Sequence, residues 1–347
     1  MVRKILVAGL ALAPLAALLD WVVGVGDVPL FCVSALALIP LAWLIGESTE
    51  HASEHTGATV GGLLNASFGN APELIIALYA INDGLPDVVR GSITGSIVSN
   101  LLLVLGFALV ATEEDDVDAR SLRWNLGLVM LAVILLLIPS VPGWHGSPER
   151  HTLAVASIPV AVVLLVVYVL VTRRNLGRRR KRTGRPAATP ESWSLRNALL
   201  TLAAATAATA VVSEILVHTL EGFASSVGLS RFFVSTVIVA IVGNAAEHGG
   251  AIVIARRGKI RLASEIAISS AAQVALLVLP LVTLLSFVVR PPLPLAFRPV
   301  ELATIAGASI AVGLMLRDRR GTKREGILLL LCYAGCVVAY YLSGNRI

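Results

Sequence analysis

The chain has 347 residues, of which 56% are hydrophobic and only 14% are charged, and its mean hydropathy is +0.83. So few polar residues cannot cover a water-soluble globule of this length, which excludes a soluble enzyme. The 28 basic and 22 acidic residues give a net charge of +6, but the basic residues lie in loops between apolar runs. In such loops they orient a membrane protein, so nucleic acid is not an expected partner. The composition therefore predicts an all-α protein that crosses the lipid bilayer many times.

Apolar runs separated by glycine, proline and charge predict eleven membrane-spanning helices, each needing about 20 residues. The first run has the layout of a secretory signal, but Pro14 and Asp20 interrupt it, and we interpret it as an uncleaved first helix. If the N-terminus is cytoplasmic, most of the basic residues fall in inside loops, as the positive-inside rule expects. The predicted spans cover approximately residues 5–23, 29–51, 59–81, 88–111, 124–140, 151–172, 197–220, 230–255, 262–288, 298–316 and 326–343.

The longest loop, residues 173–196, is strongly basic and divides the chain into two parts. We interpret it as an orientation signal and linker rather than as a specific lipid-binding site. The predicted organisation is an extra N-terminal helix in residues 1–27, a first five-helix repeat in 28–172, the basic cytoplasmic linker in 173–196 and a second five-helix repeat in 197–347.

A repeated motif supports this division. The sequence GNAPE, which ends at Glu73, reappears as GNAAE, which ends at Glu247, at an offset of 174 residues. The same offset superposes Ser96 on Ser270 and Ser99 on Gln273 without a gap. Since five spans is an odd number, the second repeat enters the membrane with the opposite sense to the first. Inverted repeats of this kind are typical of secondary transporters, whose binding site lies near the bilayer midplane.

The two motif glutamates are the strongest candidates for chemistry. Glu73 and Glu247 lie within predicted spans, where a lone carboxylate costs about 2.5 to 3.5 kcal/mol, so such residues indicate function. Pro72 removes a backbone donor in the first motif, and we expect the helix to open or kink just before the glutamate. That would free backbone carbonyls such as those of Gly69 and Gly243. Carboxylates and freed carbonyls are hard oxygen ligands, which suit Ca2+ as a transported ion.

Neutral oxygens accompany both carboxylates. Asn70 and Asn244 sit three residues before their glutamates, on the same helical face, and either supply an amide oxygen or donate to the carboxylate. Ser99 and Gln273 place polar groups on the next helix of each repeat. Two carboxylates that face each other match one divalent cation, and without it their repulsion favours protonation. A structural ion pair is the weaker alternative, because neither motif helix has a basic residue near midplane depth.

Further acidic residues lie at the ends of the preceding helices and predict an access path for cations. Their spacing of three and four residues places each set on one helical face, the first toward the cytoplasm and the second toward the outside. Carboxylates that are simply solvated at the interface are the alternative. The first set is Glu47, Glu50 and Glu54, and the second is Glu214, His218 and Glu221.

Three other features receive weaker interpretations. His248 follows Glu247 directly. It either adjusts or carries a proton at the site, or it only hydrogen-bonds a neighbouring helix. The acidic run in residues 113–118 is interpreted as a solvated cytoplasmic loop, with cation attraction or regulation as the alternative. The cysteines Cys32, Cys332 and Cys336 lie in apolar segments and are interpreted as small core residues.

The two motif segments, residues 61–75 and 241–252, resemble the signature repeats of the calcium/proton exchanger (CAX) branch of the calcium/cation antiporter superfamily. The resemblance implies an eleven-helix antiporter that moves Ca2+ out of the cytosol against inward protons, in the cell membrane of a prokaryote. It implies that Glu73 and Glu247 are the central carboxylates and that Glu50 and Glu214 flank the path. Relatives often carry an acidic segment between the halves, whereas this chain has a basic one, so their regulation is not carried over.

Several alternatives remain open from the sequence. Sodium-coupled relatives typically have Ser or Thr just before the motif glutamates and an acidic or amide residue on the following helix. This chain has Ala71, Pro72, Ala245 and Ala246 at the first places. At the others it has Ser99 and Gln273, with Asn100 as the nearest exception, so protons are the favoured counter-ion. Na+/Ca2+ exchange, exchange of another divalent cation for H+, and a divalent-cation channel are the rivals. An enzyme is least expected, since the chain has no HExxH or paired-aspartate motif. We expect no cofactor beyond the transported ions, and a homo-oligomer is left open.

Overall fold

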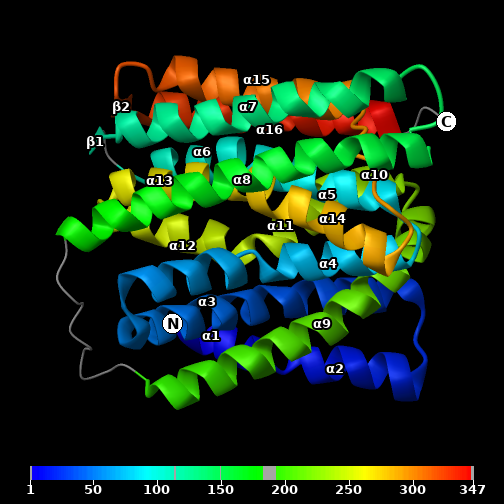
Figure 1. Cartoon of the computed structure of the whole chain (residues 1–347). Coiled ribbons are helices and arrows are strands. Elements are labelled where there is room, and N and C mark those ends of the chain that lie inside the picture. Colours follow the sequence, from blue (N-terminus) through cyan, green and yellow to red (C-terminus); the bar gives the residue numbers. More distant parts are fainter. Residues whose placement is uncertain (1, 113–114, 149, 183–192, 345–347) are drawn as a thin grey trace.

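The computed structural model describes residues 2–112, 115–148, 150–182 and 193–344. Long helices run roughly side by side between two ends of the molecule (Figure 1). In the first half the elements are α1 (Val2–Gly9), α2 (Leu12–Leu18), the π-helical turn η1 (Leu19–Val23), α3 (Asp27–Phe68), α4 (Ala71–Asn82), α5 (Pro86–Val98), η2 (Ser99–Val104), α6 (Leu105–Val110), β1 (Asp115–Asp116), α7 (Ala119–Gly143) and α8 (His151–Arg182). In the second half they are α9 (Leu195–Ser226), α10 (Arg231–Phe233), η3 (Val234–Val239), α11 (Ala240–Gly243), α12 (Ala245–Arg256), α13 (Ile260–Gln273), η4 (Val274–Val278), α14 (Leu279–Val289), α15 (Pro299–Met315), β2 (Arg320–Gly321) and α16 (Lys323–Gly344).

The helices confirm a protein that crosses the membrane many times. Within the described residues, 8 helices are long and apolar enough to cross a bilayer, and the bent pair Arg231–Gly243 and Glu247–Arg256 meets the same length and composition when its two helices are taken together. The shorter apolar helices Ala71–Asn82 and Pro299–Met315 occupy the remaining predicted spans. Large apolar side chains such as Trp21, Val288 and Leu314 are exposed at the bundle surface, as expected where a surface faces lipid.

Helix α3 differs from the prediction of two separate spans, 29–51 and 59–81. It carries helical hydrogen bonds throughout Asp27–Phe68, yet it does not run straight. The Ser53 hydroxyl donates to the Gly61 carbonyl at 3.1 Å, although residues eight apart in a straight helix are separated by about 12 Å. The chain therefore reverses within α3, and its second part runs back toward α4 (Figure 1). Two spans are present, but a helical turn joins them instead of a loop.

A glycine contact joins the two repeats at the centre of the bundle. Most of the span formed by α5, η2 and α6 is buried inside the protein. A Cβ atom added at Gly95 would lie 1.8 Å from the carbonyl oxygen of Thr236, and one added at Gly91 would lie 2.3 Å from the Ser235 hydroxyl. Small residues four apart let helix backbones approach closely in membranes. The first repeat's α5 is thereby held directly against η3, which leads to the second motif.

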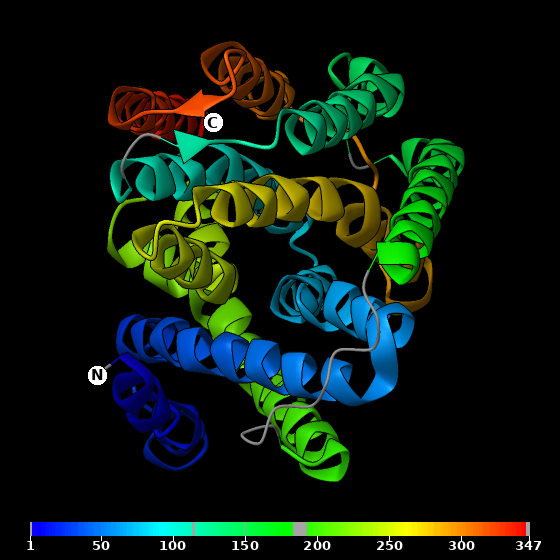
Figure 2. The same ribbon diagram turned by 90° about the vertical axis from the view of Figure 1, so that its left-hand side faces the viewer.

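A short β-bridge at the predicted cytoplasmic end joins two loops of this otherwise helical protein, and the acidic loop is one of them. Asp115 and Asp116 of β1 pair antiparallel with Gly321 and Arg320 of β2. Glu113 and Glu114 of the acidic run lie outside the described residues. Figure 2 shows the two strands beside each other at this end of the bundle. The acidic loop of the first half is thus docked on the basic loop of the second.

Asp118 extends this contact between the halves. Its carboxylate caps α7 by accepting from the backbone N–H groups of Arg120 and Ser121, and it pairs with the Arg261 guanidinium at 2.8 Å. These hydrogen bonds, the one from Arg261 above all, hold the pKa of Asp118 below its ordinary value.

Candidate cation-binding site

Both GNxxE motifs interrupt their helices, as the sequence predicts. Helix α3 ends at Phe68 and α4 begins at Ala71, while α11 ends at Gly243 and α12 begins at Ala245. Asn70 and Asn244 stand between the half-helices with non-helical backbone angles, φ −104° and ψ 20° in one and φ −94° and ψ 7° in the other. The second pair of half-helices is bent by 56°. Each glutamate therefore lies in the first turn of a new helix.

The local sequence explains how each helix restarts. Pro72 lies in the first turn of α4, where its missing N–H has no helical partner to lose. The second motif breaks without a proline, and there the Asn244 amide donates to the Ala240 carbonyl at 2.9 Å. The backbone carbonyls of the two asparagines accept the first hydrogen bonds of the restarted helices. The Leu74 N–H donates to the Asn70 carbonyl at 3.1 Å, and the His248 N–H donates to the Asn244 carbonyl at 2.9 Å. The positive end of each helix dipole then faces a carboxylate, which stabilises its charged form.

The structure brings the two motif carboxyl groups together. A Cβ atom added at Gly243 would lie 3.7 Å from Cγ of Glu73, so the first glutamate packs against the second motif. Glu73 and Glu247 are near enough to repel each other electrostatically. Both carboxylate oxygens of Glu73 are buried, and neither has a hydrogen-bond partner within the described part of the chain. Glu247 differs, because the Ser270 hydroxyl donates to its Oε2.

Hydrogen bonds between the repeats surround this acidic pair. The amide of Asn70 donates to Oε1 of Gln273 at 3.1 Å, and the amide of Asn244 donates to the Ser96 hydroxyl at 2.7 Å. Each motif asparagine thus contacts the helix that follows the motif of the other repeat. This reciprocal pattern is what two repeats related by a two-fold axis would produce.

Asn100, which the sequence analysis noted but did not assign to the site, lies beside the second motif. It is fully buried, and its amide donates to Oδ1 of Asn244 and to the Ser270 hydroxyl, both at 3.2 Å. Ser270 in turn donates to Glu247, so Asn100 joins both halves of the second motif. The 174-residue offset places Val274 opposite Asn100, so no symmetric signal marked it. The same offset superposes Ser96 on Ser270, and this is the sequence signal that points to the network around Asn100.

Two π-helical turns lie beside the site at equivalent places. Turn η2 begins at Ser99 and η4 at Val274, next to Gln273, which is the counterpart of Ser99. Insertions of this kind frequently occur at functional sites, because they redirect side chains and free backbone groups. Gln273 contacts Asn70 as described, whereas the Ser99 hydroxyl donates to the Ser96 carbonyl of its own helix at 3.2 Å. The predicted role of Ser99 therefore stays a prediction.

Two of the three acids predicted at the cytoplasmic end lie close to basic side chains. Glu47 pairs with Arg3 at 3.3 Å, and Glu54 lies 3.6 Å from Nδ1 of His51. Glu50 is exposed. The ion pair at Glu47 favours the alternative of an interfacial carboxylate for that residue.

The members of the second acidic set, on α9, have different neighbours. Glu214 is exposed and interacts with the hydroxyl of Tyr79, which lies on the same half-helix as Glu73. His218 is also exposed, while Glu221 pairs with Arg231 at 3.1 Å. Glu214 is therefore the member of this set that contacts the half-helix carrying Glu73.

His248 is buried at the second motif, and its Nε2 has no hydrogen-bond partner within the residues described. Among those same residues, no three His, Cys, Asp or Glu side chains converge as a metal site would require. Any cation held by Glu73 and Glu247 would need amide, hydroxyl and backbone oxygens to complete its shell.

Comparisons with known proteins agree with this geometry. The sequence profile described as "Sodium/calcium exchanger protein" matches residues 27–176 and 197–342. The chain belongs to the sodium/calcium exchanger family. It is 35% identical over 337 residues to the "Ca(2+)/H(+) antiporter" of Aphanothece halophytica, covering 91% of this chain and 90% of that protein. It is also 35% identical over 347 residues to "Ca(2+)/H(+) antiporter ChaA" of Bacillus subtilis, covering 96% of this chain and 97% of that one.

Solved structures show the same fold. Native YfkE superposes with a TM-score of 0.83 at 32% sequence identity, covering 99% of this chain and 100% of that chain. A second structure of YfkE, described as a Ca2+/H+ antiporter protein, gives a TM-score of 0.80 and covers 98% of both chains. The family and this fold make the chain a membrane transporter with two inverted repeats.

Proposed function

We propose that this protein exchanges Ca2+ for H+ at a single central site formed by Glu73 and Glu247. The observation that carries the proposal is the pair of acids from opposite repeats, one of which has buried oxygens without a hydrogen-bond partner among the described residues. A buried carboxylate without a partner is costly unless a cation or a proton occupies it. Both relatives named above, each 35% identical, are described as Ca2+/H+ antiporters.

The exchange follows from competition for the same oxygens. With Ca2+ bound, the two carboxylates neutralise the ion, and the amide oxygens of Asn70 and Asn244 with the carbonyls of Gly69 and Gly243 would complete its shell. When the ion leaves, repulsion between the acids favours protonation. Because one set of oxygens holds either Ca2+ or protons, alternating access to that set couples the two fluxes in opposite directions.

The surroundings of the acids favour protons over sodium as counter-ion. Gln273, Asn100 and Ser96 contact the motif asparagines from the following helices, and all three side chains are uncharged. Separate Na+ sites would call for more oxygen ligands than these positions offer. The direction of transport that we propose is Ca2+ export from the cytosol, driven by inward protons. Glu50, Glu54, Glu214, His218 and Glu221 would line the access path, and His248 is proposed to adjust or carry a proton.

The domain limits and the topology belong to the same proposal. We place the N-terminus, the acidic loop and the basic linker of residues 173–196 in the cytoplasm of a prokaryote, with the protein in its cell membrane. The basic loops support this orientation, because they lie at the end of the bundle that carries β1 and β2. The first repeat is assigned to residues 28–172 and the second to 197–347, after an extra helix in 1–27. Self-association of the chain is compatible with this arrangement.

The proposal is tested with purified protein in liposomes. A pH gradient should drive 45Ca uptake in the wild type, and an imposed Na+ gradient at clamped pH should not. Glu73→Gln and Glu247→Gln should each abolish uptake, while Glu265→Gln, a change of the same kind on α13 away from the motifs, should not. Uptake that survives both motif changes would remove the proposed site, and uptake insensitive to any counter-ion gradient would indicate a channel.

A further inference from the structure

The end of the basic linker is fastened to α3 at the predicted cytoplasmic end of the bundle. Trp193 directly precedes Ser194, the N-cap of α9, and its carbonyl oxygen accepts a hydrogen bond of 2.6 Å from Nε2 of His55. The ring of Trp193 also stacks on the ring of His51, with the centroids 4.8 Å apart and the planes at 24°. The two histidines are four residues apart and therefore lie on one face of α3. We call His51, His55 and Trp193 the linker clamp.

Glu54, one of the acids of the proposed access path, lies beside the clamp. Its Oε2 is 3.6 Å from Nδ1 of His51, and both atoms are buried without a hydrogen-bond partner among the described residues. A neutral His51 leaves the charge of this carboxylate uncompensated, whereas a protonated ring pairs with it. An approach of about 0.6 Å would bring the two atoms to the ordinary N–H···O distance of about 3.0 Å. The geometry therefore favours uptake of a proton by His51.

The other charged groups around the clamp leave this pairing in place. In the part of the chain that the structure describes, Glu54 is the acid within ion-pair distance of His51. Glu47 is paired with Arg3 of α1 at 3.3 Å, and Glu50 is exposed. Neighbouring helices carry basic side chains at this end, but these are exposed, so solvent and salt screen their repulsion of a further proton. They are Lys4 of α1, Arg173 and Arg174 of α8, Arg196 of α9 and Arg256 of α12, while Glu73, Glu247 and His248 of α4 and α12 belong to the central site.

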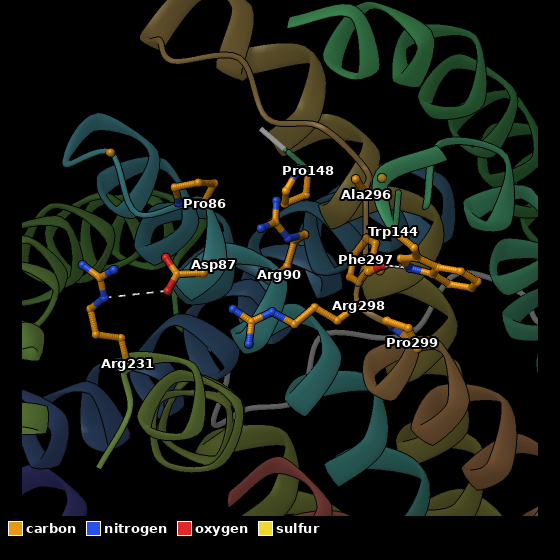
Figure 3. Close-up of a pocket in the computed structure, with 12 residues that line it drawn as sticks. Pro86, Asp87, Arg90, Trp144, Pro148, Arg231, Ala296, Phe297, Arg298 and Pro299 are labelled. Atoms are coloured by element: carbon orange, nitrogen blue, oxygen red, sulfur yellow. Dashed lines mark hydrogen bonds and ion pairs between the residues drawn. The ribbon is translucent and has the colours of Figure 1, made fainter. Parts of the chain in front are cut away.

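The predicted outer end of the bundle is held by contacts of a different kind. Figure 3 shows Arg231 beside Asp87, with the two side chains 3.7 Å apart. Arg90 and Arg298, which line the same cavity, both interact electrostatically with the buried Glu301. An arginine keeps its proton at any physiological pH, whereas a histidine changes its charge between about pH 5 and 8. The basic partner can therefore respond to pH in the clamp but not in these outer contacts.

We propose that the linker clamp is a cytosolic pH switch, which slows the entry of Ca2+ from the cytoplasmic side when the cytosol becomes acidic. The proposal rests on the proposed function. Protonation of His51 neutralises Glu54 in the access path and strengthens the stack, because the face of an indole ring attracts a cation within about 6 Å. The strongly basic linker is then held at the same mouth, where its charge repels a divalent cation. Since the proposed exchange carries protons inward, accumulation of its own product slows it.

The test measures how the initial rate of 45Ca uptake depends on pH in everted membrane vesicles, whose outer face is the cytoplasmic one. The pH difference across the membrane is kept constant. Proton competition at the central acids acts on wild type and variants alike, so the ratio of their rates isolates the clamp. His51→Gln should transport like the wild type near pH 8 and about threefold faster near pH 6. Trp193→Leu, which removes the stacked ring, should behave in the same way.

His145→Gln is the matched control, because this histidine is exposed in the loop between α7 and α8, outside the clamp, and it should keep the wild-type pH profile. Uptake by His51→Gln and Trp193→Leu with the same pH profile as the wild type would overturn the proposal. A wild type that shows no uptake driven by a pH gradient would instead contradict the proposed function, so the two failures can be told apart.

A second measurement does not depend on transport. A protonated imidazole in contact with an indole ring quenches its fluorescence, so the emission of Trp193 in purified protein reports the charge of His51. This emission is obtained as the difference between the wild type and Trp193→Phe. It should fall when the pH is lowered from about 8 to about 6, and the fall should be absent in His51→Gln. An emission that stays constant over this range would refute the switch.

Discussion

Replacing Gly95 by alanine tests whether the contact between α5 and η3 sets the geometry of the cation site. The added Cβ would lie 1.8 Å from the Thr236 carbonyl oxygen and 2.7 Å from Cβ of Ala240, while ordinary contacts begin at 3.4 Å. The nearer obstacle is backbone, so α5 must move away from η3 by about 1.6 Å. Ser96 is the next residue, and its 2.7 Å hydrogen bond from Asn244 would exceed the 3.5 Å limit after about half of that movement.

We expect this displacement to reduce transport while the protein still inserts and folds. Overpacking costs about 1–3 kcal/mol, and if it acts on the geometry of the site the initial rate of pH-driven 45Ca uptake falls about 5- to 150-fold. Gly307→Ala on α15 is the matched control, because its Cβ would meet nothing within 4 Å. Size-exclusion chromatography checks that both variants are monodisperse. A Gly95→Ala protein that transports at the rate of Gly307→Ala would refute the reasoning.

Three further predictions concern single side chains. Asn100→Val, which copies the residue of the second repeat, should raise the KM for Ca2+ about tenfold, because the hydrogen bonds to Asn244 and to Ser270 are lost. An unchanged KM would contradict the role given to Asn100. Asp118→Asn keeps a side-chain oxygen that can cap α7 but removes the charge that pairs with Arg261, and should lower the unfolding temperature slightly at pH 7. Arg261 holds the pKa of Asp118 below its ordinary value, so the ion pair stabilises the folded protein above the unfolded-state pKa of this carboxyl group. The stabilisation is lost as the pH falls through the folded-state pKa. The unfolding temperatures of variant and wild type should therefore converge in acid. Glu214→Gln should slow uptake when Ca2+ enters from the predicted outer side, and Glu50→Gln when it enters from the cytoplasmic side; equal effects from both sides in vesicles of known orientation would argue against two separate mouths.

The sequence predicted the features that depend on hydrophobicity and on local backbone chemistry. Apolar length placed the spans, because a bilayer of fixed thickness leaves few alternatives. Pro72 and the repeated GNxxE motif indicated broken helices, and the breaks lie at Asn70 and Asn244. The odd number of spans in each repeat implied opposite orientations of the two motifs, which is the arrangement that allows Glu73 and Glu247 to meet.

What the sequence could not show depends on contacts between distant segments. The predicted spans 29–51 and 59–81 placed a reversal between residues 51 and 59, but nothing local showed that a continuous helix would make it, since the helical hydrogen bonds run through Ser53 and Gly61. Asn100 gave no repeated signal, because its counterpart in the other repeat is Val274. The sharing of Glu301 between two arginines from α5 and α15 likewise exists only after the helices have packed.

The bridge between β1 and β2 restricts how the protein can open. With Asp118 and Arg261, this strap fastens the inner ends of α7, α13 and α16 to one another, although the two halves of the chain supply them. Any separation of these helices at the inner end would therefore have to break both the strand pairing and the ion pair between Asp118 and Arg261.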